Sequence, residues 1–353
     1  MTRVWRAVTA AWLVALPMAV IARQASVPPA AGPDRAKEVH LANVKQLTFG
    51  GENAEAYFSF DGQDLIFQST REGHQCDQIY AMRIDGSNVR RLSNGEGRTT
   101  CSFFYPDKKH VLYASTFLGG KSCPAKPDFS RGYVWPVYDS YDIFHANADG
   151  TGIERLTTTP GYDAEATISR DGRIVFTSVR DGDMEIYSMN GDGTNVRRLT
   201  NRPGPDGGPF FSPDGTKIVF RGRPLAPGPE LDDYKALLRE GLWRPTSLEI
   251  FVMDADGGNL KQVTSLAGAS FAPYFTPDGT RIIFASNYQD PKKRDFELYL
   301  VNVDGSGLER VTYNPTFDGF PMFSPDGRHL VFASNRNDAK PGDTNVFIAD
   351  WQP

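Results

Sequence analysis

The stretch Phe210-Phe211-Ser212-Pro213-Asp214-Gly215 ends in a tight-turn signal, and the apolar run Lys217-Ile218-Val219-Phe220 follows it at once. An Asp-Gly pair between two such runs predicts a β-hairpin. The spacings between consecutive turn aspartates are 46, 64, 43, 64 and 48 residues. Periods of roughly 40 to 50 residues built from short strands are typical of propeller blades. The other turns of this family are Asp61-Gly62, Asp107-Lys108, Asp171-Gly172, Asp278-Gly279 and Asp326-Gly327.

A second family of Asp-Gly turns alternates with the first, so each repeat contains four strands. The fourth strand has an apolar-polar-polar-apolar-hydroxyl pattern, as in Val196–Thr200. The last repeat, ending at 345–351, lacks this strand, and the missing copy, Val44–Thr48, precedes the first repeat. The sequence therefore predicts an all-β, six-bladed β-propeller of four-stranded antiparallel blades. An N-terminal strand completes the last blade and hides two sheet edges.

The N-terminus indicates export. Arg3 and Arg6 precede an apolar stretch over 7–22 that ends in small residues, so we expect a signal peptide over 1–22. A membrane anchor is the alternative, but the stretch is short for a span and Pro17 interrupts it. We expect a flexible linker over 23–40, a propeller over 41–353, no transmembrane segment in the mature chain, and a periplasmic or secreted monomer. The net charge of −5 argues against nucleic-acid partners.

One face of the predicted ring carries long loops. Both turn families are short and share the other face, whereas the loops between the second and third strands hold insertions at 117–141 and 222–247. Long loops on a rigid scaffold are where binding usually resides. Trp135 and Trp243 lie in these insertions and are candidate binding residues, unless they pack the insertions onto their own blades. A helix is expected near 229–241, lying on the rim or acting as a lid.

Polar residues recur at the start of each innermost strand, where they should surround the channel mouth. Oxygen ligands in a ring suit Ca²⁺ or a basic group. Asp163, Asp206 and Asp318 are the candidate Ca²⁺ ligands. Alternatively, each Asp caps its own loop or pairs with an arginine of the loop between the second and third strands, such as Arg71, Arg180 or Arg336. The first position is held by Asn53, Thr99, Asp163, Asp206, Ser270 and Asp318, and the position two residues on by Glu55, Cys101, Glu165, Gly208, Ala272 and Phe320. The predicted binding residues among them are Asn53, Glu55, Asp163, Glu165, Asp206 and Asp318.

The three cysteines, Cys76, Cys101 and Cys123, should all lie on the loop-bearing face. In an exported protein we expect one disulfide and one free thiol. Cys101 lies between the other two in blade order, so it is predicted to pair with Cys123 or with Cys76. The alternative is a Cys₃His metal site that includes His74.

Catalytic signatures are absent from the sequence, and no catalytic residue is predicted. There is no Gly-x-Ser-x-Gly, His-Glu-x-x-His or phosphate-binding loop. Gly268–Ala272 is close to a nucleophile elbow but leads into a strand rather than from a strand to a helix.

Repeats such as Phe323-Ser324-Pro325-Asp326-Gly327, followed by Leu330–Arg336, resemble the propeller repeats of the TolB family over residues 41–353. The resemblance implies a six-bladed propeller related to a periplasmic component of the Tol–Pal system, whose propeller docks a peptidoglycan-associated lipoprotein. That family carries an α/β domain ahead of its propeller, and we expect no counterpart here because residues 23–40 alone follow the leader. Similar repeats precede the catalytic domains of prolyl-oligopeptidase-like enzymes, so they specify fold better than function.

Together these features favour an exported, non-enzymatic propeller that binds a protein, peptide or cell-wall partner through its loop-bearing face. The alternative is a glycan lyase or hydrolase with its site at the channel mouth. Apart from the possible Ca²⁺, no cofactor is predicted.

Overall fold

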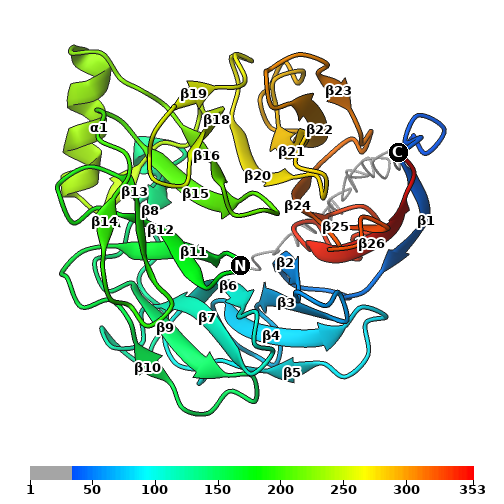
Figure 1. The fold of residues 1–353 in the computed structure, drawn as a ribbon, viewed down its shortest axis with the longest axis horizontal. Coiled ribbons are helices and arrows are strands. Elements are labelled where there is room, and N and C mark those ends of the chain that lie inside the picture. The colour runs from blue at the N-terminus through cyan, green and yellow to red at the C-terminus, as the bar shows by residue number, and fades with distance from the viewer. Residues whose placement is uncertain (1–33) are drawn as a thin grey trace, which may run out of the picture. The chain divides into compact units, whose positions relative to one another are not determined.

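The computed structural model describes residues 34–353, which form six four-stranded antiparallel sheets arranged as blades of a propeller (Figure 1). The six-bladed prediction is confirmed. From the channel outward, the innermost strands are β2 (Asn53–Phe58), β6 (Thr99–Phe104), β11 (Asp163–Ile168), β15 (Asp206–Phe211), β20 (Ser270–Phe275) and β24 (Asp318–Phe323). The second strands are β3 (Asp64–Ser69), β7 (His110–Ser115), β12 (Arg173–Ser178), β16 (Lys217–Gly222), β21 (Arg281–Ser286) and β25 (His329–Ser334).

The outermost strand is the shortest in each of the first five blades. Each of the first five blades ends in a strand of two residues. The third strands are β4 (Gln78–Arg83), β9 (Asp142–Asn147), β13 (Glu185–Asn190), β18 (Glu249–Asp254), β22 (Glu297–Asn302) and β26 (Asn345–Trp351). The outermost strands are β5 (Arg90–Arg91), β10 (Glu154–Arg155), β14 (Arg197–Arg198), β19 (Lys261–Gln262), β23 (Glu309–Arg310) and, for the last blade, β1 (Leu41–Gln46).

The chain closes the ring as predicted, because β1 pairs antiparallel with β26 from Leu41 opposite Trp351 to Gln46 opposite Phe347. The strand begins slightly earlier than the expected 44–48. Residues 34–40 were expected to belong to a flexible linker, but Glu38 and His40 are buried against the last two blades. The predicted signal peptide and the rest of the linker lie outside the described residues.

The recurrent Ser-Pro-Asp-Gly sequence makes a self-contained turn. In the fourth blade the Ser212 hydroxyl donates to Asp214 at 2.6 Å, and Asp214 accepts the N–H of Thr216 at 3.0 Å. Gly215 has a φ of +71°, a conformation that favours glycine. The turn satisfies polar groups within itself, so the loops on this face of the ring can be short.

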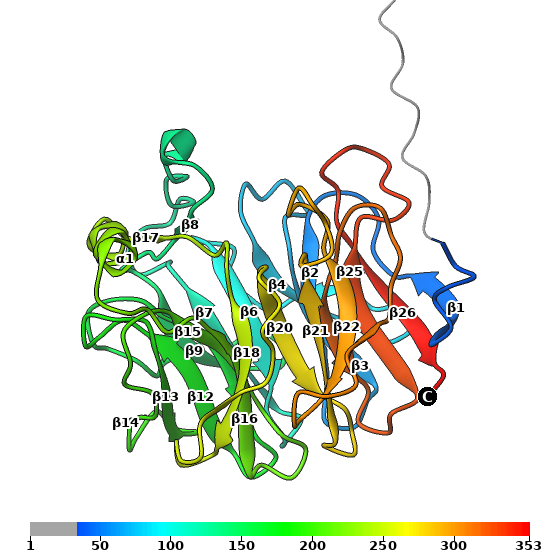
Figure 2. The same ribbon diagram turned by 90° about the horizontal axis from the view of Figure 1, so that it is seen from above.

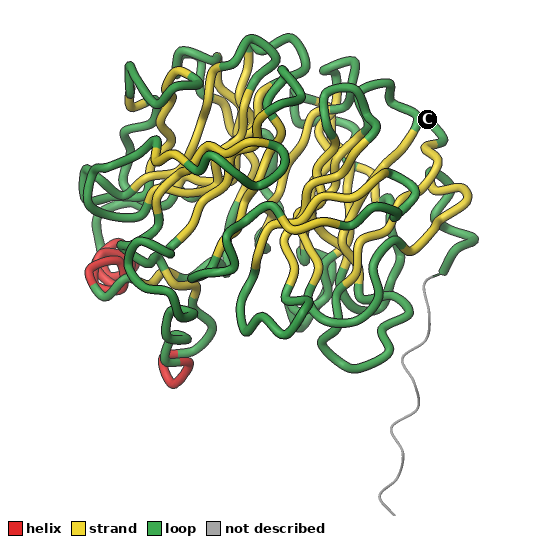
Figure 3. The backbone as a smooth tube through the Cα atoms, turned by 90° about the horizontal axis from the view of Figure 1, so that it is seen from below, coloured by secondary structure: helices red, strands yellow, loops and turns green. Residues whose placement is uncertain are grey.

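The two insertions meet each other above the third blade. The insertion of blade two contains η1 (Phe129–Arg131) and β8 (Trp135–Pro136), and that of blade four contains α1 (Pro229–Arg239) and β17 (Leu242–Trp243). Strand β8 pairs with β17, placing Trp135 opposite Trp243. Figures 2 and 3 show that these elements stand on one side of the ring. Each insertion therefore supports the other rather than its own blade alone.

Helix α1 forms within the stretch predicted for it. Leu231, Tyr234 and Leu237 are buried on one face of the helix. The Tyr234 hydroxyl donates to Asp183, in the loop before β13, at 2.6 Å. The helix is thereby attached to the third blade at its rim.

Candidate binding pocket at the channel mouth

Every innermost strand contains a β-bulge near its start. The bulged residue has a positive φ, between +49° and +60°, in all six strands, and the pairing register shifts around it. A bulge bends the strand and redirects a side chain. The six bulged residues are Glu55, Cys101, Glu165, Gly208, Ala272 and Phe320, and all of them line one pocket.

The position two residues earlier serves a different purpose. Asp163 accepts two hydrogen bonds from Arg180 at 3.0 and 2.9 Å, and Arg202 donates to Asp206 at 2.6 Å. Asp318 accepts from Arg336 at 2.6 Å. Burial raises the pKa of Asp206 to about 6 although Arg202 opposes the shift.

The hypothesis that three aspartates share a Ca²⁺ is therefore wrong. Each carboxylate is buried beside an arginine. Arg180 and Arg336 lie in the loops after the second strands, as the alternative proposed, whereas Arg202 lies in the loop before β15. Asn53 is also buried and accepts a hydrogen bond from Ser69 at 2.7 Å. Within residues 34–353, no three His, Cys, Asp or Glu side chains are grouped as a metal site requires. The three aspartates of this ring therefore form ion pairs with arginines instead of converging on one cation.

The pocket at the bulges spans about 530 Å³ of space, which includes its open mouth. Trp135 lines it from the inserted β8–β17 pair and lies edge-to-face against Trp243 and Phe271, with ring centroids 5.7 and 6.4 Å away. Trp135 thus contributes to the pocket wall, whereas Trp243 is buried beside it. The structure brings Trp135, Glu55 and Glu165 together, and their binding role stays a prediction.

Aromatic side chains close the inner end of this pocket. The ring of Tyr57 contacts those of Phe103 and Phe210, at centroid distances of 5.7 and 5.4 Å, and Phe210 contacts Tyr274 at 5.5 Å. We call these four residues the aromatic plug. Tyr57 and Phe210 also line the pocket. The pocket is therefore blocked on its inner side by packed rings.

Glu165 has its charge balanced locally. Its carboxylate accepts from Nη2 of Arg221 at 2.5 Å, from the Thr177 hydroxyl at 2.7 Å and from the N–H of Gly208 at 2.9 Å. The guanidinium of Arg221 also lies over the Trp243 ring, 5.7 Å from its centroid. A side chain at Gly208 would collide with Nη1 of Arg221. Because Gly208 has no side chain, the guanidinium of Arg221 fits beside this bulge.

Sequence reasoning missed Arg221, although a signal was present. The corresponding residue of the other second strands is Gln68, Ala114, Thr177, Ala285 or Ala333. A charged residue at a position otherwise filled by small or uncharged ones, on a buried strand, requires a partner. Its partner is Glu165, one blade away.

Glu55 faces the same pocket without a counterion. Among residues 34–353 it forms no ion pair, and its hydrogen-bonding neighbour is the Cys101 thiol. Desolvation raises the pKa of Glu55 to about 8, and the negative charge of Glu165 adds to the shift. Desolvation, reinforced by the charge of Glu55, raises the pKa of the Cys101 thiol well above its ordinary value. At neutral pH both groups are protonated.

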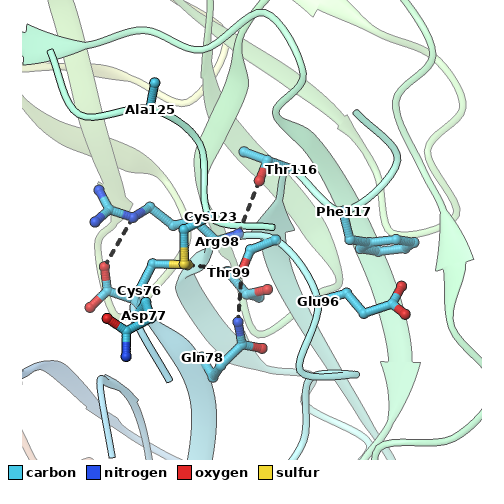
Figure 4. The surroundings of a disulfide bond; sticks show 12 residues. Cys76, Asp77, Gln78, Glu96, Arg98, Thr99, Thr116, Phe117, Cys123 and Ala125 are labelled. Carbon is cyan, nitrogen blue, oxygen red and sulfur yellow. Dashed lines mark hydrogen bonds and ion pairs between the residues drawn. A yellow bond between two sulfur atoms is a disulfide. The ribbon is translucent and has the colours of Figure 1, made fainter. Parts of the chain in front are cut away.

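The disulfide joins Cys76 to Cys123 (Figure 4), with Cα atoms 5.8 Å apart. Cys101 is free. The prediction that Cys101 belongs to the bridge is wrong. Cys76 and Cys123 lie in neighbouring loops, whereas the bulge turns Cys101 into the channel. The Cys₃His alternative also fails, because His74 contacts Arg91 and two of the three sulfurs are bonded to each other.

Comparison with known proteins agrees with this architecture. The family described as TolB beta propeller domain matches residues 242–351. A protein TolB homolog from Chlorobium chlorochromatii is 26% identical over 143 residues, which is 34% of this chain and 32% of that protein. The chain is a six-bladed β-propeller, and part of it is similar to the TolB propeller family. It spans about a third of the length of that curated relative.

Solved structures share the TolB-like fold over most of the chain. Putative TolB from Agrobacterium tumefaciens superposes with a TM-score of 0.58 at 20% identity, covering 86% of this chain and 91% of that one. TolB from Acinetobacter baumannii gives 0.54 at 18% identity, covering 85% and 63%. A gluconolactonase from Xanthomonas campestris also gives 0.58, at 13% identity, covering 91% and 95%. At these identities the likeness concerns the fold alone.

One further observation bears on membrane association. Within the described part of the chain, no helix is both long and apolar enough to cross a bilayer.

Proposed function

We propose that this protein is an exported binding protein that holds a segment of a cell-envelope protein or peptide partner in the pocket at its loop-bearing mouth. The observation that carries the proposal is the convergence of six bulged residues and Trp135 on one pocket with a closed inner end. Aromatic walls with a few placed polar groups are typical of recognition sites. Export rests on the leader-like sequence of residues 1–22 and on the resemblance to the TolB family.

The paired insertions support a partner larger than a small molecule. They stand on one side of the ring (Figure 2), and Trp135 of β8 lines the pocket. Tyr133, two residues before Trp135, is 60% exposed. Its hydroxyl accepts from the Trp135 indole N–H at 2.8 Å, so the exposed ring is linked to the pocket wall. A partner segment in the pocket would therefore also contact the insertions.

The proposal is tested by photo-crosslinking at the two ends of the channel. Benzoylphenylalanine replaces Phe320 in the pocket in one variant and Phe60 at the opposite mouth in another, both aromatic and both lining a pocket. With envelope extract, we expect a discrete crosslinked partner from position 320 and none from position 60. Crosslinking from position 60 alone, or from neither position, would contradict the proposal.

A second candidate function has one specific observation in its favour. Glu55 carries a proton at neutral pH and faces Glu165 and Arg221 in one pocket, an arrangement that a glycan hydrolase or lyase could use for general acid catalysis. If so, the protein should release reducing sugar from envelope polysaccharide, and Glu55→Gln should abolish the release. Turnover that survives this substitution would remove the enzyme hypothesis.

A further inference from the structure

The charges of the pocket are distributed unequally. Glu165 and Arg221 neutralise each other at 2.5 Å, and Asp77, which lies near Glu55, faces Arg98 at 3.5 Å. Arg221 acts on Glu55 more weakly than burial, Glu165, Cys101 and Asp77 do. The remaining carboxyl group in the lining, Glu55, has no cation of its own among the described residues.

Apart from the ion-paired residues, the other titratable groups near Glu55 and Glu165 are neutral near pH 7. Burial raises the pKa of Cys101, Tyr57 and Tyr162 well above their ordinary values, and the charges of neighbouring acids add to each shift. These groups come from three different strands or loops around the pocket. None of them can supply the positive charge that an ionised Glu55 requires.

The pocket wall offers aromatic rings in addition to this carboxyl group. Ring faces attract cations, most strongly when the cation is desolvated. Arg221 already shows this, since its guanidinium lies over Trp243 at the edge of the same aromatic cluster. An uncompensated carboxylate among aromatic rings is the combination that binds ammonium groups. The rings that line the pocket are those of Tyr57, Trp135, Phe210, Phe271 and Phe320.

Resting on the proposed binding function, we propose that the pocket recognises an ammonium group of the ligand, which pairs with Glu55 and displaces its proton. A neutral ligand group would leave Glu55 protonated and gain no ion pair. An anionic group would meet Glu55 and Glu165 and would compete with Glu165 for Arg221. The ammonium could belong to a lysine side chain or to a chain N-terminus, which share this chemistry.

The exchange of a proton for a cation fixes the direction of the pH dependence. In the empty pocket Glu55 is protonated below about pH 8, so binding at pH 6 must release close to one proton. The affinity should therefore rise about tenfold per pH unit from pH 6 to 8. It should level off above that, until the amine itself loses its proton near pH 10.

The first experiment is calorimetric titration of the folded protein with n-butylammonium, in two buffers of different ionisation enthalpy at pH 6.5. At pH 6.5 we expect n-butylammonium to bind with release of nearly one proton. At pH 9 we expect it to bind without proton release. The neutral isostere n-butanol and the anion butyrate should bind at least tenfold more weakly. Equal binding of butanol, stronger binding of butyrate, or binding of butylammonium without proton release would overturn the proposal.

A matched pair of variants assigns the effect to Glu55. Glu55→Gln should lose at least tenfold in affinity for n-butylammonium together with the proton release. Glu72→Gln is the control, because Glu72 belongs to the same blade, also has a positive φ (+60°), and lies outside the pocket lining. If Glu72→Gln weakens binding as much as Glu55→Gln does, the ammonium is not at Glu55 and the proposal fails.

Two further titrations distinguish the source of the ammonium. Nα-acetyl-lysine amide carries a side-chain ammonium and a blocked N-terminus, whereas glycylglycine amide carries a terminal ammonium alone. Tighter binding of the first supports a lysine of the partner, and tighter binding of the second supports its N-terminus. If neither binds but position 320 still crosslinks a partner, the ammonium inference fails while the binding function stands.

Discussion

The two mouths of the channel differ although the same six strands build both. At the turn-bearing mouth, a pocket is lined by equivalent turn residues of several repeats, among them Ser59, Ser169, Ser212 and Ser324. It spans about 700 Å³ of space, which includes its open mouth. Its one charged lining residue in the described chain is Arg170, which stacks on Phe60 at 5.5 Å. At the loop-bearing mouth the six equivalent positions are Glu, Cys, Glu, Gly, Ala and Phe. Where repeats agree, the residues serve the fold; where they diverge, they can serve a ligand.

The difference between the two mouths depends on a closed ring of blades. The prediction with the largest expected effect therefore disrupts the contacts that hold the N-terminal segment to the last blade. Arg336 is fully buried and donates to both Glu38, before β1, and Asp318, in β24. Arg336→Met would leave two carboxylates buried without a cation, so it should lower the free energy of unfolding by about 3–5 kcal/mol. The exposed Arg328→Met is the control and should change it by less than about 0.5 kcal/mol. Denaturant titration measures both; similar values for the two variants would contradict the role of Arg336.

The disulfide ties the insertion of blade two to blade one, so it should matter at the loop-bearing mouth. It closes a loop with a sequence separation of 47 residues. Replacing Cys76 and Cys123 with serine should cost about 3–4 kcal/mol on loop-entropy grounds. Peptide mapping of the oxidised protein should find Cys101 alone alkylated without reduction. Alkylation of Cys76 or Cys123 in the folded, oxidised protein would refute the pairing.

Gly208 and Gly215 mark the two ends of one hairpin and permit a matched substitution. Both have a positive φ, of +60° and +71°, so alanine costs about 1 kcal/mol at each. At Gly208 the added Cβ would also displace Arg221 from Glu165, whereas at Gly215 the nearest atom is Nη2 of Arg173 at 3.3 Å. Gly208→Ala should therefore cost about 2 kcal/mol or more. Thermal unfolding that shows equal losses would mean that Arg221 can move freely.

The protonated carboxyl group at the loop-bearing mouth should be visible in the pH dependence of stability. A carboxyl group whose folded pKa is raised binds more protons when folded, so its contribution is lost as pH rises from about 4.5 through 8. Glu55→Gln should therefore be more stable than wild type at pH 9, by about 1–2 kcal/mol after screening by pocket water, and equal to it near pH 4.5. If the stability difference between Glu55→Gln and wild type does not change with pH, Glu55 is solvated and its pKa is not raised.

The sequence predicted the six blades and their closure because both depend on local turns and on strand counts. It also predicted that the ring at Glu55 and the insertion at Trp135 share one face. It could not decide which of the two adjacent rings faces the channel, because that depends on a bulge in each innermost strand. For this reason the sequence predicts Ca²⁺ at the ring of Asp163, Asp206 and Asp318. For the same reason it predicts that Cys101, which the bulge turns into the channel, is part of the disulfide.

The pairing of the two insertions was also beyond the sequence. Residues 135–136 and 242–243 are each too short to be identified as strands, and their pairing spans more than a hundred residues. Arg221 was predictable in principle from its contrast with the equivalent positions, but its partner in another blade was not. Long-range pairs of single side chains leave no periodic signal.

The smallest expected effect belongs to the turn-bearing mouth. Arg170 is exposed and stacks on Phe60, and a cation–π contact at an exposed site is worth about 0.5–1 kcal/mol. Arg170→Gln should therefore change the free energy of unfolding by less than about 1 kcal/mol. Because the aromatic plug separates the two pockets, Arg170→Gln should leave the affinity for n-butylammonium unchanged within twofold. Calorimetry and denaturant titration check both numbers. A clear change in n-butylammonium affinity would show that charge at one mouth reaches the other, and the division between a structural and a ligand-binding mouth would have to be abandoned.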